Sequence, residues 1–150
     1  MNINFSLNKF FISHNEGLLN TGLLLLRIII GVILFIVGSG KVFGWFGGQG
    51  LSLTIQGYGM GGFSPFWAYL STFTELIGGF LLIIGLLTRL VSIPVIINML
   101  VATIVMWPKG FLTGADLPFT VLGIAIVILL TGPGAYSIDS LIFRSRGNVW

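Results

Sequence analysis

Long apolar stretches alternate with short polar or glycine-rich segments along this chain, and the pattern predicts helices that cross a membrane. A helix needs about 20 apolar residues to cross the roughly 30 Å hydrocarbon core of a bilayer. The apolar stretch over residues 66–107 would be roughly 60 Å long as one helix, so we expect it to turn back near residues 87–90. Four spans are therefore predicted, at about residues 22–43, 66–87, 90–107 and 117–131.

The segments outside these spans have different characters. Residues 44–65 are rich in glycine and aromatic side chains and lack a periodic apolar face, which predicts a loop, partly re-entrant, between the first two spans. Residues 1–21 are predicted to form a cytoplasmic tail, either interfacial or disordered. Residues 132–150 form the predicted cytoplasmic C-terminal segment, in which Ser137 caps a short interfacial helix ending at Phe143.

The composition agrees with a membrane protein. Hydrophobic residues make up 55% of the 150 residues and charged residues only 7%, whereas about a quarter of the residues in a soluble domain are charged. We therefore predict an all-α fold, an integral membrane four-helix bundle whose glycine- and aromatic-rich loop joins spans one and two. The net charge of +3 comes from a few lysines and arginines that lie mostly at span ends, so no nucleic-acid partner is expected.

Residue types that bind metals and redox centres are scarce. The chain has no cysteine, and His14 is its only histidine. This excludes disulfides, thiolate nucleophiles, cysteine-ligated iron–sulfur clusters and bis-histidine haem ligation within the chain. No metal site and no covalently bound cofactor are predicted, so any redox chemistry has to come from a dissociable cofactor or a partner protein.

The basic residues predict the orientation in the membrane. Four spans place both termini on one side of the bilayer. Lysines and arginines are more numerous on that side: Lys9, Arg89, Arg144 and Arg146 lie there, and Lys41 and Lys109 lie on the other. The positive-inside rule therefore places both termini in the cytoplasm.

Small residues recur on two of the predicted spans. One face of the first span is small in its middle and cationic at both ends, with members at Arg27, Gly31, Leu34, Gly38 and Lys41. In the second span, Gly78 and Gly79 follow Glu75 at the spacing of one helical turn. Glycines beside a charge allow a neighbouring backbone to come close, as is typical of membrane helices.

Arg27 and Glu75 are charged residues well inside predicted spans. A charge in hydrocarbon costs several kcal/mol unless it is paired or hydrogen-bonded. Because the long guanidinium side chain can reach across much of their difference in depth, we predict a buried Arg27–Glu75 pair, with Asn98 of the third span donating a hydrogen bond to the carboxylate. The pair is either a working site or a structural clamp.

Two further pairs are predicted at the ends of the bundle. Lys41 and Asp116 both lie at outer ends of spans, and Arg89 and Asp139 both lie near the inner face. Exposed pairs of this kind contribute about 0–1 kcal/mol. A structural role is therefore favoured for both, most strongly for Arg89 and Asp139.

Aromatic residues gather near the outer mouth of the predicted bundle. They are Trp45, Phe46, Tyr58, Phe63, Phe66, Trp67 and Tyr69. An aromatic belt at the membrane–water interface is the favoured interpretation. The alternative is the wall of a pocket for a flat lipophilic ring such as a quinone, with Lys41 or Arg27 as hydrogen-bond donor.

Several motifs resemble the DoxX family of small four-span bacterial membrane proteins. They are "LLRIIIGVILFIVGSGKVFGWFGGQG", "TELIGGFLLIIGLLTRL", "GADLPFTVLG" and "LLTGPGAYSID". The matching positions are Arg27, Lys41, Glu75, Arg89 and Asp116, the last standing where relatives often have Glu. Many relatives also have a histidine near the end of span three, where this chain has "MWPKG".

The resemblance implies a bundle in the bacterial cytoplasmic (inner) membrane and a link to respiratory or stress-related redox systems. Relatives include a subunit of a thiosulfate:quinone oxidoreductase and membrane partners of superoxide-detoxifying or thiol-redox enzymes. The first hypothesis is accordingly a membrane subunit that binds a quinone or similar lipophilic redox partner. Arg27 and Glu75 would form the floor of its site, and Lys41 and Asp116 would lie near the outer opening.

Two other functions are left open by the residues. One is a small transporter or proton-linked permease that uses the same charges as a relay, and the other is a membrane scaffold in which they only lock helices together. The lipid bilayer is an expected partner in every case. A soluble or membrane oxidoreductase partner and a homo-oligomer are further expectations.

Overall fold

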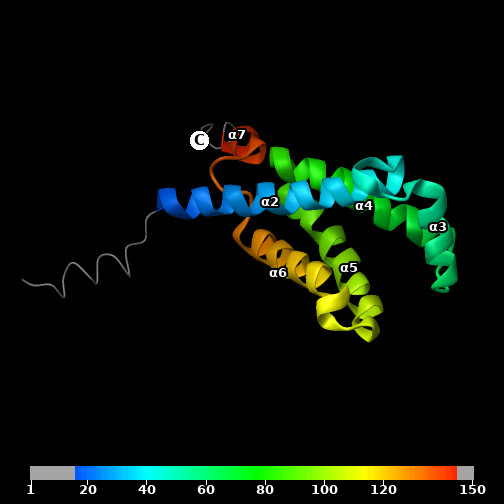
Figure 1. Ribbon diagram of the computed structural model, residues 1–150. Helices are drawn as coiled ribbons and strands as arrows, with labels where there is room; N and C mark the ends of the chain where they lie inside the picture. The colour runs from blue at the N-terminus through cyan, green and yellow to red at the C-terminus, as the bar shows by residue number, and fades with distance from the viewer. Residues whose placement is uncertain (1–15, 145–150) are drawn as a thin grey trace, which may run out of the picture.

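A computed structural model describes residues 16–144, and every regular element in that range is helical (Figure 1). The predicted tail over residues 1–21 lies mostly outside the described residues. The α-helices are α2 (Glu16–Phe43), α3 (Gly50–Met60), α4 (Pro65–Ile84), α5 (Thr88–Met106), α6 (Asp116–Thr131) and α7 (Ile138–Arg144). Three short 3-10 turns complete the fold: η1 (Trp45–Gly47), η2 (Trp107–Lys109) and η3 (Phe111–Thr113).

Three helices are long and apolar enough to cross a membrane, namely α2, α4, and α5 with the η2 turn that continues it. The fourth predicted span is α6, an apolar helix of 16 residues. Large apolar side chains are exposed along α2, α4, α5 and α6. Exposure of this kind is expected where lipid, rather than water, surrounds a helix. The protein is therefore an all-α membrane protein, as the sequence predicts.

The helices α2 and α4 lie side by side and antiparallel (Figure 1). Glycines bring their backbones together: a Cβ added at Gly38 would lie 2.4 Å from the backbone nitrogen of Leu76, and one added at Gly79 would lie 2.5 Å from that of Phe35. A Cβ at Gly31 would similarly meet the carbonyl oxygen of Gly79 at 2.9 Å. The predicted small-residue packing is thus confirmed, because no larger side chain fits at these positions.

The helices α5 and α6 pack against each other, and α5 leaves the end of α4 at a wide angle (Figure 1). A core of apolar side chains joins this pair to α2 and α4. Its buried members are Ile30, Leu34, Leu82, Val91, Val95, Met99, Val121, Ala125 and Ile128. In a bilayer the hydrophobic effect does not drive helices together, because lipid tails are as apolar as the side chains. Close packing of these side chains stabilises the association of the helices instead.

The segment predicted as a loop over residues 44–65 contains a helix, α3. The prediction of an irregular loop was wrong here, because glycines at positions 57 and 59 lower helix propensity and only Thr54 of α3 is buried. Contacts with neighbouring helices hold the segment instead. Tyr58 donates a hydrogen bond to Ser71 of α4 at 2.8 Å, and Thr54 contacts the Lys41 carbonyl oxygen at 3.4 Å.

The start of α2, the α4–α5 turn and α7 lie at one end of the bundle, and α3 and the short turns lie at the other (Figure 1). Gly85 follows the end of α4 with a φ of +70°, which suits glycine, and the turn passes through Leu87 at a φ of +52°. The backbone amide of Ser140 donates to the Ser137 hydroxyl at 3.0 Å. The predicted capping of the short C-terminal helix by Ser137 is therefore confirmed.

Candidate functional site

Three polar side chains from three helices meet inside the bundle. Lys41 of α2 contacts both carboxylate oxygens of Glu75 of α4, with Nζ 2.8 Å from Oε1 and 2.7 Å from Oε2. Asn98 of α5 donates from Nδ2 to Oε1 at 3.2 Å. The predicted hydrogen bond between Asn98 and Glu75 is thus confirmed. We call Lys41, Glu75 and Asn98 the polar cluster.

Burial differs among the members of the polar cluster. The Glu75 side chain is 4% exposed and that of Lys41 is 27% exposed, while Asn98 is half-buried. The carboxylate therefore lies inside the bundle, and its two donors connect it to the surface. An ammonium has three N–H donors and an amide has two, so Lys41 and Asn98 each have donors beyond the one that bonds Glu75 Oε1. The Oδ1 acceptor of Asn98 also has no hydrogen-bond partner among the described residues.

The close approach of α2 and α4 determines which cation reaches Glu75. Because Gly38 lies against the backbone of Glu75 and Leu76, Lys41, one turn further along α2, is within reach of the carboxylate. Thr72 lies one turn before Glu75 on the same face of α4, fully buried, with a hydroxyl that has no partner among the described residues. Our sequence reasoning overlooked Thr72, although its spacing of three residues from Glu75 was a usable signal.

The predicted Arg27–Glu75 pair was wrong. Arg27 lies opposite the other end of α4, where a Cβ added at Gly85 would be 2.5 Å from Arg27 Nη1. Ten residues separate Gly85 from Glu75, or about 15 Å along a helix, which is beyond the reach of an arginine side chain. The prediction from the span boundaries therefore underestimated the difference in depth between Arg27 and Glu75.

Arg27 instead anchors the segment between α6 and α7. Its Nη1 donates to the Pro133 carbonyl oxygen at 2.7 Å, and its Nη2 donates to that of Tyr136 at 2.6 Å. Arg27 is only 2% exposed. Charged hydrogen bonds to two main-chain carbonyls compensate for its burial. Arg27 thereby ties α2 to the α6–α7 segment, at the end of the bundle away from the polar cluster.

The other two predicted pairs do not form either. Asp139 accepts hydrogen bonds from the backbone amides of Leu87 at 2.7 Å and Thr88 at 2.8 Å, so its carboxylate caps α5 rather than pairing with Arg89. Helix α5 has no acidic residue in its first turn, and an incoming carboxylate therefore meets unsatisfied amides there. Asp116 is exposed in the first turn of α6, while Lys41 is engaged by Glu75.

We expect Asp139→Ala to lower the free energy of unfolding by about 1–2 kcal/mol, because two amides at the start of α5 would lose their acceptor. Asp116→Ala is the matched control, since this carboxylate is exposed in the first turn of α6; a loss of about 0.5 kcal/mol or less is expected. Urea unfolding in mixed micelles measures both. Equal losses for the two variants would contradict the capping role of Asp139.

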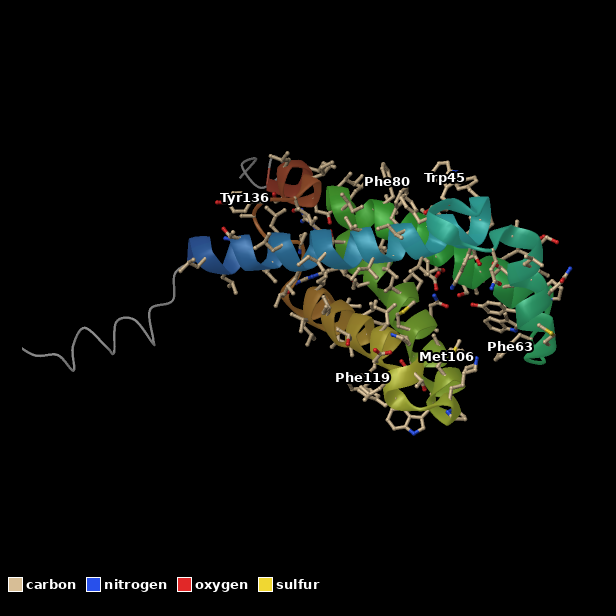
Figure 2. All side chains as sticks on the ribbon, viewed as in Figure 1. Trp45, Phe63, Phe80, Met106, Phe119 and Tyr136 are labelled. Atoms are coloured by element: carbon tan, nitrogen blue, oxygen red, sulfur yellow. The ribbon has the colours of Figure 1, made fainter. Side chains whose placement is uncertain are left out.

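The aromatic residues lie mainly on the outside of the protein. Trp45, Phe46, Phe66, Trp67 and Tyr69 are all exposed. Figure 2 shows Trp45 and Phe63 at the end of the bundle that carries α3, with Tyr136 at the opposite end beside α7. This distribution is typical of an interfacial belt. The alternative, a pocket wall for a flat lipophilic ring, stays a prediction.

Within residues 16–144 no group of three or more histidine, cysteine, aspartate or glutamate side chains could hold a metal ion. The polar cluster consists of one carboxylate, one ammonium and one amide. Such a set can donate hydrogen bonds to a carbonyl oxygen and can accept hydrogen bonds on the carboxylate. These are the capabilities that the described residues offer to a bound molecule.

The fold and the buried polar cluster define a small multi-pass helical membrane protein. Residues 22–108 match the sequence profile of the DoxX family. The match covers more than half of the chain, and the chain belongs to the DoxX family. This agrees with the resemblance of its motifs.

A comparison with curated proteins finds a relative in Bacillus subtilis (strain 168) named "Putative oxidoreductase CatD". The two sequences are 35% identical over 128 residues, which cover 85% of this chain and 91% of the relative. No solved structure matches the chain significantly.

Proposed function

We propose that this protein is a membrane subunit of an oxidoreductase system and that the polar cluster binds a quinone or another lipophilic redox partner. The name of the Bacillus subtilis relative supports the link to redox chemistry. Membership of the DoxX family supports a location in the bacterial inner membrane, and the positive-inside rule supports an orientation in which the end that carries α7 faces the cytoplasm.

The observation that carries this proposal is a buried carboxylate whose two donors reach the surface. Glu75 is 3% exposed as a residue, and neither Lys41 nor Asn98 is fully buried. The donors left on Lys41 and Asn98 suit the carbonyl oxygens of a quinone ring, which needs few polar contacts within apolar walls.

Each member of the polar cluster has a distinct role in this proposal. Lys41 and Asn98 bind and orient the ring through its carbonyl oxygens. Glu75 holds Lys41 and Asn98 in place through its hydrogen bonds with both. A bound quinone would supply two-electron redox chemistry. The chain has no cysteine and one histidine, so the electrons come from a partner oxidoreductase.

The experiment is an isothermal calorimetric titration, in which a short-chain quinone is added to purified protein in neutral detergent and its affinity is measured. We expect Asn98→Leu and Glu75→Gln each to weaken binding by about tenfold or more, as is usual when a hydrogen bond to a charged or buried group is lost. Glu16→Gln is the matched control for the carboxylate, because Glu16 is exposed in the first turn of α2. Its affinity should equal that of the wild type.

Circular dichroism and gel filtration establish that each variant is folded before its affinity is compared. Wild-type affinity in both folded variants would overturn the assignment of the quinone to the polar cluster. Quinone binding that is absent from the wild type would overturn the proposal as a whole.

A further inference from the structure

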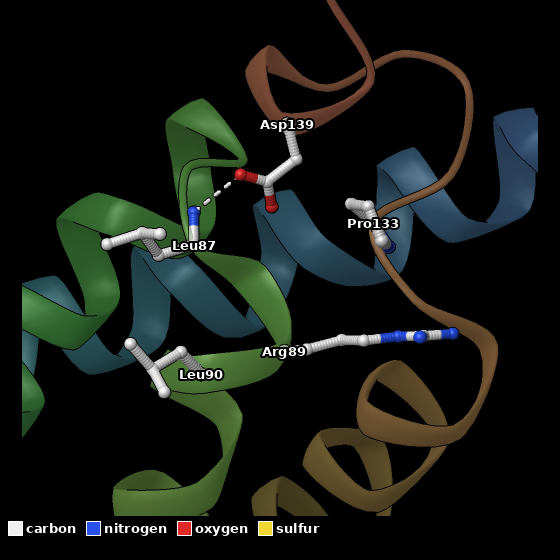
Figure 3. Close-up of a pocket in the computed structure, with 5 residues that line it drawn as sticks. All are labelled: Leu87, Arg89, Leu90, Pro133 and Asp139. Carbon is white, nitrogen blue, oxygen red and sulfur yellow. Dashed lines mark hydrogen bonds between the residues drawn. The ribbon is translucent and has the colours of Figure 1, made fainter. Parts of the chain in front are cut away.

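A second site lies at the end of the bundle that carries α7. A pocket of about 310 Å³ is lined there by Leu87, Arg89, Leu90, Pro133 and Asp139 (Figure 3). It shares no lining residue with the polar cluster. The pocket lies where α4 ends and α5 begins, which is the level at which spans meet the polar region of a bilayer.

Arg89 is the cation of this pocket and has no ion-pair partner among the described residues. It is exposed in the first turn of α5, where the helix dipole disfavours positive charge. Its guanidinium lies against the backbone of Gly132, since a Cβ added there would be 3.1 Å from both Nε and Nη2. The planar fork of N–H donors matches the oxygens of a phosphate.

Asp139 does not neutralise this cation directly. Both of its carboxylate oxygens accept backbone amides of the α4–α5 turn, at 2.7 and 2.8 Å. Figure 3 shows Asp139 turned toward the Leu87 nitrogen, while Arg89 extends past Pro133 on the other side of the pocket. One side of the pocket therefore presents a guanidinium to an incoming anion.

Apolar side chains continue from the pocket along the outside of the bundle. Leu87 is 45% exposed and Leu90 is 63% exposed. From Leu90 onward, α5 carries an exposed apolar stripe at helical spacing, made of Leu90, Ile93, Ile97, Val101 and Ile104. A cation at the membrane surface followed by an apolar stripe of this length fits a molecule with an anionic head and a long hydrocarbon tail.

We propose that this pocket binds an anionic phospholipid. Arg89 contacts the phosphate of the headgroup, the pocket walls at Leu87 and Pro133 enclose the glycerol region, and an acyl chain lies along the α5 stripe. Basic residues at helix ends bind anionic headgroups in other membrane proteins by the same electrostatics. This inference goes beyond the proposed redox function and does not depend on it.

Native mass spectrometry tests the lipid site. Full-length protein in neutral detergent is titrated with phosphatidylglycerol or with phosphatidylcholine of the same acyl chains. We expect phosphatidylglycerol to bind roughly fivefold more tightly, the preference expected from one basic residue at a membrane surface. Arg89→Gln should reduce the affinity for phosphatidylglycerol to that for phosphatidylcholine, whereas Arg89→Lys should keep part of the preference.

Lys109→Gln is the matched control, because Lys109 is an exposed cation at the other end of the bundle. It should keep the wild-type preference. Equal affinity of the wild type for the two lipids would overturn the proposal, as would a full preference retained by Arg89→Gln. Binding of inorganic phosphate to the wild type as tightly as phosphatidylglycerol, and its loss in Arg89→Gln, would assign the pocket to a free anion instead of a lipid.

Discussion

Lys41→Met is expected to lower the free energy of unfolding by about 3–5 kcal/mol, because it removes the only cation that pairs with a carboxylate inside the bundle among the described residues. Glu75 would keep its 3.2 Å hydrogen bond from Asn98 and would lose both contacts with the ammonium. Methionine preserves the length of the side chain, so the loss of charge dominates the effect. Urea unfolding in mixed micelles gives the free energy.

The control for this prediction is Lys109→Met, which makes the same substitution at an exposed position outside the polar cluster. We expect it to change stability by about 0.5 kcal/mol or less. The double variant Lys41→Met/Glu75→Gln should recover much of the stability lost by Lys41→Met, because it leaves no uncompensated buried charge. A Lys41→Met protein as stable as the Lys109→Met protein would show that the buried ion pair does not form.

Gly38→Ala should destabilise the protein by about 3 kcal/mol or more, at the upper end of the cost of overpacking. The added Cβ would lie 2.4 Å from the backbone nitrogen of Leu76 and 2.7 Å from its Cα. Main-chain atoms cannot move aside as a side chain does, so α2 and α4 would have to separate. The separation would also weaken the contact between Lys41 and Glu75, which depends on this close approach.

Gly22→Ala is the control on the same helix, because a Cβ at that position would meet no atom within 4 Å. Alanine favours a helix interior over glycine by roughly 0.8–1 kcal/mol, so this variant should be as stable as the wild type or slightly more stable. Thermal unfolding in detergent compares the two. If Gly38→Ala behaved like Gly22→Ala, the backbone contact between α2 and α4 would be refuted.

The spans and the helix contacts within them could be predicted from the sequence because both depend on local pattern. Apolar length determines where α2, α4 and α5 can cross a membrane. Glycines at helical spacing indicated the face on which α2 meets α4. The Asn98–Glu75 hydrogen bond was predicted for a similar reason, since a buried carboxylate requires donors and Asn98 is an amide in the adjacent span.

The partner of Glu75 could not be predicted in the same way, because it depends on how far α2 slides along α4. Arg27 and Lys41 lie on one face of α2, so helical periodicity treats them alike. The glycine contacts place Lys41 near the carboxylate and Arg27 at the opposite end of α4. A shift along a helix of a few residues changes the partner, and no single-sequence pattern reports such a shift.

Asp139 shows a second kind of missed contact. The sequence predicted a pair between the Asp139 carboxylate and the Arg89 side chain. The carboxylate instead accepts hydrogen bonds from the backbone amides of Leu87 and Thr88. Backbone amides at a helix start are present in every sequence and therefore leave no mark in the pattern of residue types. The missing acid in the first turn of α5 was the one available sign.

The central claim is that the polar cluster binds a lipophilic redox molecule rather than only clamping α2 to α4. The most direct measurement is mass spectrometry of the lipophilic molecules that copurify with gently extracted wild-type protein and with folded Lys41→Met/Glu75→Gln protein. We predict a quinone in the wild-type extract and its absence from that of the double variant. Equal amounts of quinone in both extracts, or none in either, would contradict the claim and leave the polar cluster with a structural role.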